Sequence, residues 1–248
     1  MSRDIGKYRR KERGKKQATK HCFENTGARL ADFPMNHKAR AFLALAICVV
    51  PAFLWFLMFD PRCKAWVPNF WAVMSTAAAS LILISFLMSK REDRSIYLFN
   101  WRHIPMGLLL ALFLYGVTWG SGKTLAYFFP QKAPQQVESV YELKFGTSQF
   151  IIAGLLLFLI GPAEEIFWRG YLQTTLVKGF GASIGFLLTT AIYTLIHIWS
   201  HNPTLLAAAA VLGAIWGLCF QRWGRLWPVL ISHALWDCVV FVVAPVHP

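Results

Sequence analysis

Long apolar runs separated by short polar stretches dominate the sequence after residue 40. Each run is close to the roughly 20 residues that an α-helix needs to cross a bilayer. The runs occupy residues 41–59, 66–89, 104–129, 148–177, 181–200, 204–220 and 226–245, and the longest polar stretch between them is 130–147. This pattern predicts an all-α fold, namely a polytopic transmembrane helix bundle with about seven to eight spans.

Composition supports a bilayer as the natural surroundings of this chain. Of the 248 residues, 56% are hydrophobic and 15% are charged, and the mean hydropathy is +0.45. Soluble domains are roughly half apolar and about a quarter charged. We expect three parts: a basic tail at 1–40, N-terminal transmembrane helices at 41–147, and a C-terminal set of transmembrane helices at 148–248.

The positive charge is concentrated at the N-terminus. The formal net charge is +13, and residues 1–40 hold twelve Lys or Arg against four Asp or Glu. A basic segment beside the first span is typical of cytoplasmic retention and of attraction to anionic lipid. Placing the N-terminus inside puts 20 Lys or Arg on the inner side and five on the outer side. The sequence thus predicts a multi-pass protein of the cell inner (cytoplasmic) membrane with a cytoplasmic N-terminus.

Nucleic-acid binding is the rival interpretation of the basic tail. The tail lacks the interleaved aromatic residues and the fold motif that such a function requires. We therefore expect anionic lipid, and no nucleic acid, as the partner of this segment.

Ionisable residues interrupt the apolar runs of the C-terminal half. Such groups cost about 2.5–3.5 kcal/mol each at membrane depth on insertion scales, and those that occur tend to be functional. Six of them fall in three of the last four runs: Glu164, Glu165, Arg169, His197, His233 and Asp237. This concentration predicts a functional cluster.

The spacing of these residues along a helix predicts which of their side chains lie on the same face. Glu165 and Arg169 are four residues apart, in the order that favours an ion pair. Glu164 points about 100° away around the helix, so the two carboxylates need not share a role. A turn near 179–181 with antiparallel packing would bring Glu164 and His197 to one level. Tryptophans are expected mostly at the lipid interfaces, with Trp168 and Trp236 as candidates for the walls of the site.

Three motifs in order resemble those of the CPBP family of intramembrane proteases, which includes type II CAAX prenyl proteases and bacteriocin-processing Abi relatives. They are GPAEEIFWRGY, AIYTLIH and ISHALWD, and they cover about residues 161–239. The resemblance implies that Glu164 and His197 activate a water while His233 and residue 237 bind the oxyanion. It also implies that Arg169 holds the glutamates in place, so that Glu165 and Arg169 have a supporting role, and it makes 148–248 the catalytic part.

Position 237 departs from the pattern, because it is Asp where the prenyl proteases carry Asn. An ionised Asp cannot donate a hydrogen bond to an oxyanion. Asp237 therefore either stays protonated or orients His233, and we favour orientation.

The residues leave open whether a metal takes part. A glutamate can serve as base for water and then as acid for the leaving amine. Two histidines and a glutamate could equally hold zinc, and the set would then be Glu164, His197 and His233. No H-E-x-x-H motif is present. We favour a mechanism with no metal and no cofactor, partly on the resemblance, and keep zinc as the alternative.

Function follows as a hypothesis. We expect an endopeptidase that hydrolyses a peptide bond of a membrane-associated protein or peptide at the cytoplasmic membrane face. The alternative is a non-enzymatic bacteriocin-immunity or scaffold protein that uses the same buried polar cluster. A proton-coupled transporter is less favoured, because no internal repeat is present.

Overall fold

The computed structural model describes residues 34–63, 65–66 and 69–247, so most of the predicted basic tail lies outside the described residues. Within the described part of the chain, all regular structure is helical. In this described part, six helices are long and apolar enough to cross a membrane: His37–Phe59, Phe70–Met88, His103–Phe128, Gln149–Phe180, Ala182–Ser200 and Pro203–Trp223. The shorter apolar helix Trp227–Val243 adds a seventh. The predicted all-α polytopic bundle is confirmed.

The elements follow one another along the chain with short connections. The first half contains α2 (His37–Ile47), α3 (Val49–Phe59), η3 (Pro61–Cys63), α4 (Phe70–Met88), η4 (Arg91–Tyr97), α5 (His103–Phe128), α6 (Lys132–Tyr141) and η5 (Glu142–Lys144). The second half contains α7 (Gln149–Leu155), η6 (Leu156–Ile160), α8 (Gly161–Glu165), η7 (Ile166–Gln173), α9 (Thr174–Phe180), α10 (Ala182–Leu195), η8 (Ile196–Ser200), α11 (Pro203–Trp223), α12 (Trp227–Cys238) and η9 (Val239–Val243).

Local residue chemistry sets several helix ends. The side chains of Asn36, Asn69 and Asn202 accept hydrogen bonds from the first turns of α2, α4 and α11, at 2.8, 3.1 and 3.0 Å. Such caps satisfy backbone N–H groups that have no partner within the helix. Gly181 (φ +90°) and Gly224 (φ +62°) end α9 and α11 in conformations that disfavour other residues.

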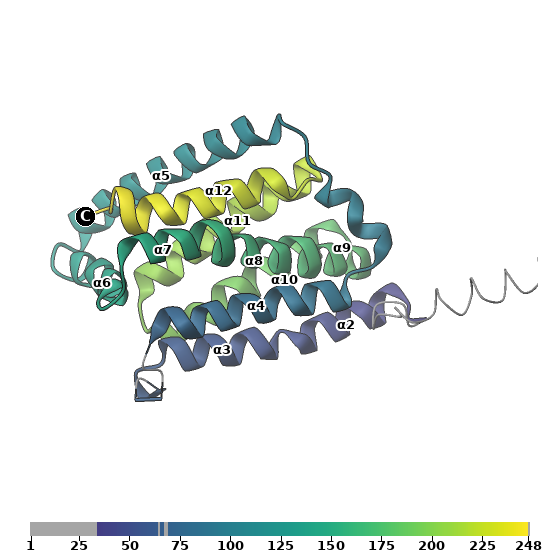
Figure 1. Ribbon diagram of the computed structural model, residues 1–248, viewed down its shortest axis with the longest axis horizontal. Coiled ribbons are helices and arrows are strands. Elements are labelled where there is room, and N and C mark those ends of the chain that lie inside the picture. Colours follow the sequence, from purple (N-terminus) through teal and green to yellow (C-terminus); the bar gives the residue numbers. More distant parts are fainter. Residues whose placement is uncertain (1–33, 64, 67–68, 248) are drawn as a thin grey trace, which may run out of the picture. The chain divides into compact units, whose positions relative to one another are not determined.

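The run from α7 to α9 lies in the middle of the bundle (Figure 1). Helix α12 packs against α8 and α5, while α4 packs against α8 and η7. Helix α10 packs against α9 and α11, and α2 packs against α9. The segment that carries the paired glutamates is therefore surrounded by other helices.

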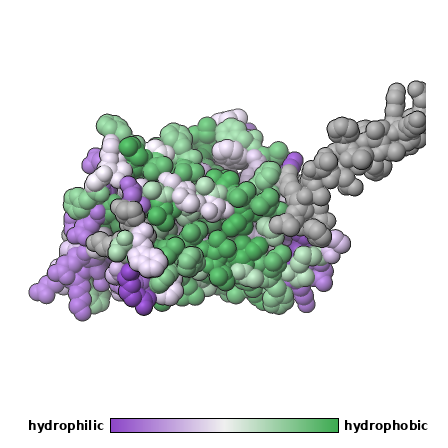
Figure 2. Space-filling view, turned by 60° about the horizontal axis from the view of Figure 1, so that its bottom comes forward, coloured by the Kyte–Doolittle hydropathy of each residue, from purple (hydrophilic) through white to green (hydrophobic). Residues whose placement is uncertain are grey.

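Apolar side chains also cover the outside of the bundle. Leu108, Leu109, Leu112 and Phe113 of α5 keep 50–69% of their surface exposed. Figure 2 shows apolar residues across the middle of the visible face and hydrophilic residues towards both ends. This distribution fits helices that face lipid along their middle and water at their ends.

The central run is not a regular α-helix. Segments η6 and η7, on either side of α8, are π-helical. Pro162 lies at the start of α8 and has no N–H to donate to the preceding turn, so the helix there cannot keep its regular ladder. π-Helical turns, which contain more residues than an α-helical turn, occur often at functional sites. Hydropathy and spacing alone did not predict these π-helical segments.

Candidate active site

Glu165 lies at the centre of a buried ion-pair network. Its Oε1 atom lies 2.5 Å from Nη1 of Arg169 and 2.6 Å from Nδ1 of His233. Arg169 also donates from Nη2 to the carbonyl oxygen of Gly213 at 2.9 Å. Both members of the pair are almost fully buried, with 0% and 1% of their surface exposed. The ion pair predicted from the i,i+4 spacing is present, and the bond to His233 is an addition to it.

His233 is held on three sides. An ionised carboxylate only accepts hydrogen bonds, so Nδ1 of His233 donates to Glu165. The Nε2 atom lies 3.5 Å from Oδ2 of Asp237. The indole ring of Trp216 stacks on the imidazole with the ring centres 3.9 Å apart, and its Nε1 donates to Ser232 at 3.1 Å. These contacts fix the plane of the imidazole ring.

His197 is oriented through both ring nitrogens. Nδ1 lies 2.8 Å from the carbonyl oxygen of Tyr193, which can only accept, so Nδ1 carries the proton. Nε1 of Trp55 donates to Nε2 of His197 at 3.4 Å. The edge of the Trp55 ring and the ring of Phe59 also lie against the imidazole. Helices α3 and α10 together therefore set the tautomer, in which Nε2 holds a lone pair.

The four predicted catalytic residues line one cavity of about 130 Å³. They are Glu164, His197, His233 and Asp237, each with no more than 9% of its surface exposed. Among the described residues, none forms a hydrogen bond with the carboxylate of Glu164. Glu165 and Arg169 are not part of the lining and lie behind His233. The neighbouring glutamates thus differ: one faces the cavity and the other belongs to the ion-pair network.

Aromatic residues complete the walls, and the sequence placed only some of them. Trp236 lines the cavity as expected. Trp168 is fully buried but packs behind Tyr193, with the ring centres 5.4 Å apart. Trp55 and Trp216 line the cavity and are buried, although tryptophans were expected mostly at the lipid interfaces. No sequence signal distinguishes them, because Trp55 lies in the ordinary apolar run 41–59.

A second cavity of about 190 Å³ adjoins the first. It lies between α5, α6, α11 and α12, and apolar side chains form nearly all of its lining. The two cavities share the lining residues Val140, Leu205, Ala208, Leu212, Trp236 and Phe241. An apolar chamber therefore lies directly beside the polar cluster.

The described residues show no metal-ligand arrangement. Across the described ranges, no three His, Cys, Asp or Glu side chains converge as they would around a metal ion. The choice between a metal-free mechanism and one that uses zinc on Glu164, His197 and His233 stays a prediction.

The comparisons with known proteins bear on this segment. Residues 146–239 match the family model described as type II CAAX prenyl endopeptidase Rce1-like. The chain matches no curated protein and no solved structure. The family match runs from the residues just before α7 to η9 and contains all six predicted site residues. It confirms the resemblance that the three motifs indicated, over less than half of the chain.

Proposed function

We propose that this protein is an intramembrane endopeptidase in which Glu164 and His197 activate a water molecule for attack on a peptide bond. The observation that carries the proposal is the shared cavity of Glu164, His197, His233 and Asp237, enclosed among membrane-spanning helices. A cavity of about 130 Å³ has room for water. The alternative of a non-enzymatic immunity or scaffold protein has no structural observation in its favour.

The proposed reaction assigns one task to each side chain. Glu164, which has no hydrogen-bond partner among the described residues, takes a proton from water as the water oxygen attacks the carbonyl carbon. His197 accepts a hydrogen bond from the same water at Nε2, where the water shares the lone pair with the long 3.4 Å bond from Trp55. When the C–N bond breaks, Glu164 returns the proton to the leaving amine nitrogen. Atoms and charge balance without any further reactant.

His233 is proposed to stabilise the oxyanion. Its Nε2 faces the cavity and can donate only when the ring is doubly protonated. Glu165 and Asp237, one at each ring nitrogen, would balance the charge of that imidazolium. Asp237 would thus act by supporting His233, which fits its replacement of the amide found in prenyl proteases.

Partners and location follow the same proposal. The substrate is a protein or peptide that reaches the cavity within the membrane. The N-terminus is proposed to lie in the cytoplasm, with the basic tail at 1–40 against anionic lipid, and the protein is proposed to reside in the cytoplasmic membrane.

The test compares cells that produce the wild-type chain with cells that produce Glu164→Gln, in the presence of ¹⁸O-labelled water. Wild-type cells should contain membrane-protein fragments whose new C-terminal carboxylates carry ¹⁸O from water. Glu164→Gln, His197→Ala and His233→Ala should each reduce these fragments by about 10²–10⁴-fold, as expected for loss of an acid–base group. Asp237→Asn should retain more activity than Asp237→Ala, because the amide still contacts Nε2 of His233.

Equal production of the same fragments by Glu164→Gln protein, present at the wild-type level in the membrane, would contradict the proposal. The immunity or scaffold alternative makes the opposite prediction, since binding by the intact fold should survive this isosteric change.

A further inference from the structure

Most residues that line the active-site cavity lie towards the same end of the bundle, whereas Glu164, Trp216 and His233 lie near its middle. From α3 and α4 they are Trp55, Phe59, Phe70, Trp71 and Met74, which adjoin the connection between these two helices. From α11 they are Leu205, Ala208, Ala209, Leu212 and Trp216, and all but Trp216 lie in the half that begins at Pro203. Helix α10 contributes only Tyr193, near its last residue, and η8 contributes His197. The cavity therefore extends from the middle of the bundle towards the end that holds α6.

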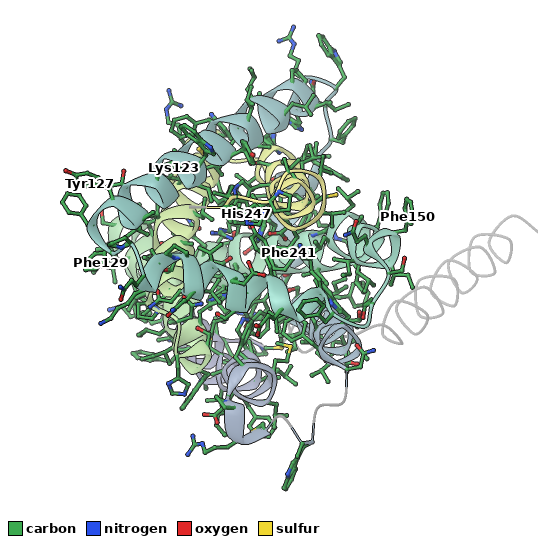
Figure 3. All side chains as sticks on the ribbon, turned by 90° about the vertical axis from the view of Figure 1, so that its left-hand side faces the viewer. Lys123, Tyr127, Phe129, Phe150, Phe241 and His247 are labelled. Carbon is green, nitrogen blue, oxygen red and sulfur yellow. The ribbon has the colours of Figure 1, made fainter. Side chains whose placement is uncertain are left out.

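We call this the α6 end, defined by α6, η3, η5 and the connection 201–202. The opposite, η4 end is defined by the start of α2, by η4 and by the connections at 181 and 224–226. Figure 3 looks onto the α6 end, with Phe241 near the centre of the view and Lys123 and Tyr127 on the last turns of α5. Phe241 lines both cavities.

The segment over the cavity is attached by polar contacts at the α6 end. Val140 and Leu143, from α6 and η5, line the cavity there. Trp71 donates to the carbonyl oxygen of Leu143 at 2.9 Å, and Asn202 donates to the carbonyl oxygen of Gln136 at 2.7 Å. No residue of η4, α9 or the connection 224–226 contributes to the lining. The lining of the cavity thus reaches the α6 end and does not reach the η4 end.

Basic residues, in contrast, gather at the η4 end. Among the described residues, nine Lys or Arg lie there: Lys38, Arg40, Lys90, Arg91, Arg94, Arg102, Lys178, Arg222 and Arg225. Four described Lys or Arg lie at the α6 end: Arg62, Lys123, Lys132 and Lys144. Lys and Arg near span ends mark the cytoplasmic side, and acidic residues contribute little to this rule. Seven of the nine lie outside the predicted tail at 1–40, so a bias of seven to four remains without it.

We infer that the active site opens on the non-cytoplasmic face of the membrane and takes polypeptides whose scissile bond lies on that side. The substrate class would be exported, membrane-anchored proteins or peptides, with apolar residues near the scissile bond to suit the adjoining apolar chamber. This inference names the substrate class on the basis of the proposed function, whereas the sidedness rests on the lining and the charges alone. It differs from the cytoplasmic-face cleavage that the sequence suggested.

Single cysteines test the sidedness in intact cells. Cys22, Cys63 and Cys219 are replaced by alanine, and the buried Cys48 and Cys238 are retained. Three variants then each add one cysteine: Ser148→Cys at the exposed α6 end, Ser95→Cys on the exposed side of η4, and Ala208→Cys in the cavity wall. The parent without an added cysteine measures background. Each protein is exposed to a membrane-impermeant sulfonated maleimide before and after permeabilisation.

We expect Ser148→Cys and Ala208→Cys to react in intact cells and Ser95→Cys to lose its labelling unless the membrane is permeabilised. Labelling of Ser95→Cys in intact cells would overturn the inference. The inference would also be overturned if Ala208→Cys were labelled only under the conditions that label Ser95→Cys. The same holds if Ala208→Cys were not labelled before or after permeabilisation. The same measurements in a Glu164→Gln background need no hydrolysis, so failure of the proposed reaction and failure of the sidedness are separate results.

Discussion

Nδ1 of His233 lies 2.6 Å from Oε1 of Glu165, a residue 68 positions earlier in the chain. The same oxygen accepts a hydrogen bond from Arg169 at 2.5 Å. One carboxylate oxygen therefore connects the central helix run to α12 and orients the imidazole that faces the cavity. Neighbouring Glu164 lies on the cavity itself, so two adjacent residues of identical chemistry have separate environments.

The first prediction contrasts the two glutamates. Glu165→Gln should lower thermal stability, because Arg169 is left as a buried charge without its partner, a change that costs about 3–5 kcal/mol. Glu164→Gln should leave stability near wild type, since this carboxylate has no hydrogen-bond partner among the described residues. Thermal unfolding in detergent, read beside proteolytic activity, measures both effects. Equal destabilisation by the two substitutions would contradict the assignment.

A double variant sharpens the same prediction. Glu165→Gln combined with Arg169→Met removes the buried charge together with its partner. The pair should therefore recover part of the stability that Glu165→Gln alone loses. A strictly additive double-mutant cycle would show that the 2.5 Å contact does not couple the two side chains.

The second prediction concerns Trp55 and the tautomer of His197. Trp55→Phe keeps an aromatic ring but removes the N–H that reaches Nε2 at 3.4 Å. Loss of a hydrogen bond of this kind costs about 0.5–1.5 kcal/mol, so kcat should fall by roughly two- to tenfold. The ¹⁵N shift of His197 Nε2 should change while Nδ1 stays protonated.

Trp71→Phe is the matched control for Trp55→Phe. It removes the bond to the carbonyl oxygen of Leu143 and leaves both ring nitrogens of His197 untouched. The His197 ¹⁵N shifts should therefore remain as in wild type. If both variants moved these shifts alike, Trp55 would have no specific role in positioning the imidazole.

The third prediction uses the close approach of α8 and α12. A Cβ at Gly161 would lie 2.8 Å from Cα of Ala234, which is backbone and cannot rotate away. Gly161→Ala should therefore destabilise the protein by about 1–3 kcal/mol, as overpacking does. Gly154→Ala, in α7 of the same run, adds a methyl group with nothing within 4 Å and should be neutral or stabilising. Thermal unfolding compares the two, and a smaller loss at Gly161 than at Gly154 would refute the packing.

The fourth prediction concerns acid stability at the α6 end. Hydrogen bonds from Arg62 to Asp60, two of them at 2.8 Å, hold the pKa of the Asp60 carboxyl well below its usual range. A carboxyl group with a lowered pKa in the folded state stabilises the fold at pH values above the unfolded-state pKa of about 3.9. This contribution is lost as the pH falls through the lower pKa of the folded state.

Asp60→Asn is therefore expected to lower the Tm at neutral pH and to flatten the fall of Tm with acidification below about pH 4. A series of Tm measurements between pH 3 and 7 tests both effects. Arg62→Gln should produce the same flattening, because it removes the partner. A curve for Asp60→Asn that runs parallel to the wild-type curve at all pH values would rule out this linkage.

Much of the site was visible in the sequence because its residues are chemically out of place. Ionisable groups in apolar runs are costly, so Glu164, Glu165, Arg169, His197, His233 and Asp237 could be selected from one chain. The i,i+4 spacing also predicted the contact between Glu165 and Arg169, since helical neighbours meet wherever the helix packs. The roles assigned to these residues stay predictions for the experiments above.

Other parts of the site could not be selected in this way. Trp55 and Trp216 are apolar residues in apolar runs, and nothing local marks them as neighbours of His197 and His233. The π-helical turns around α8 depend on how Pro162 is accommodated between packed helices. The division of the glutamates depends on which side of the central run α12 covers.

The sequence by itself determined the helical bundle, the spans and the residues of the polar cluster, because hydrophobic length and buried charge are properties of short segments. Only the tertiary structure decided that Glu165 holds His233, that Trp55 orients His197, and that the cavity extends towards the α6 end. These relationships join segments separated by 68 and 142 positions. They arise from the way the helices pack, which no pattern within a single helix specifies.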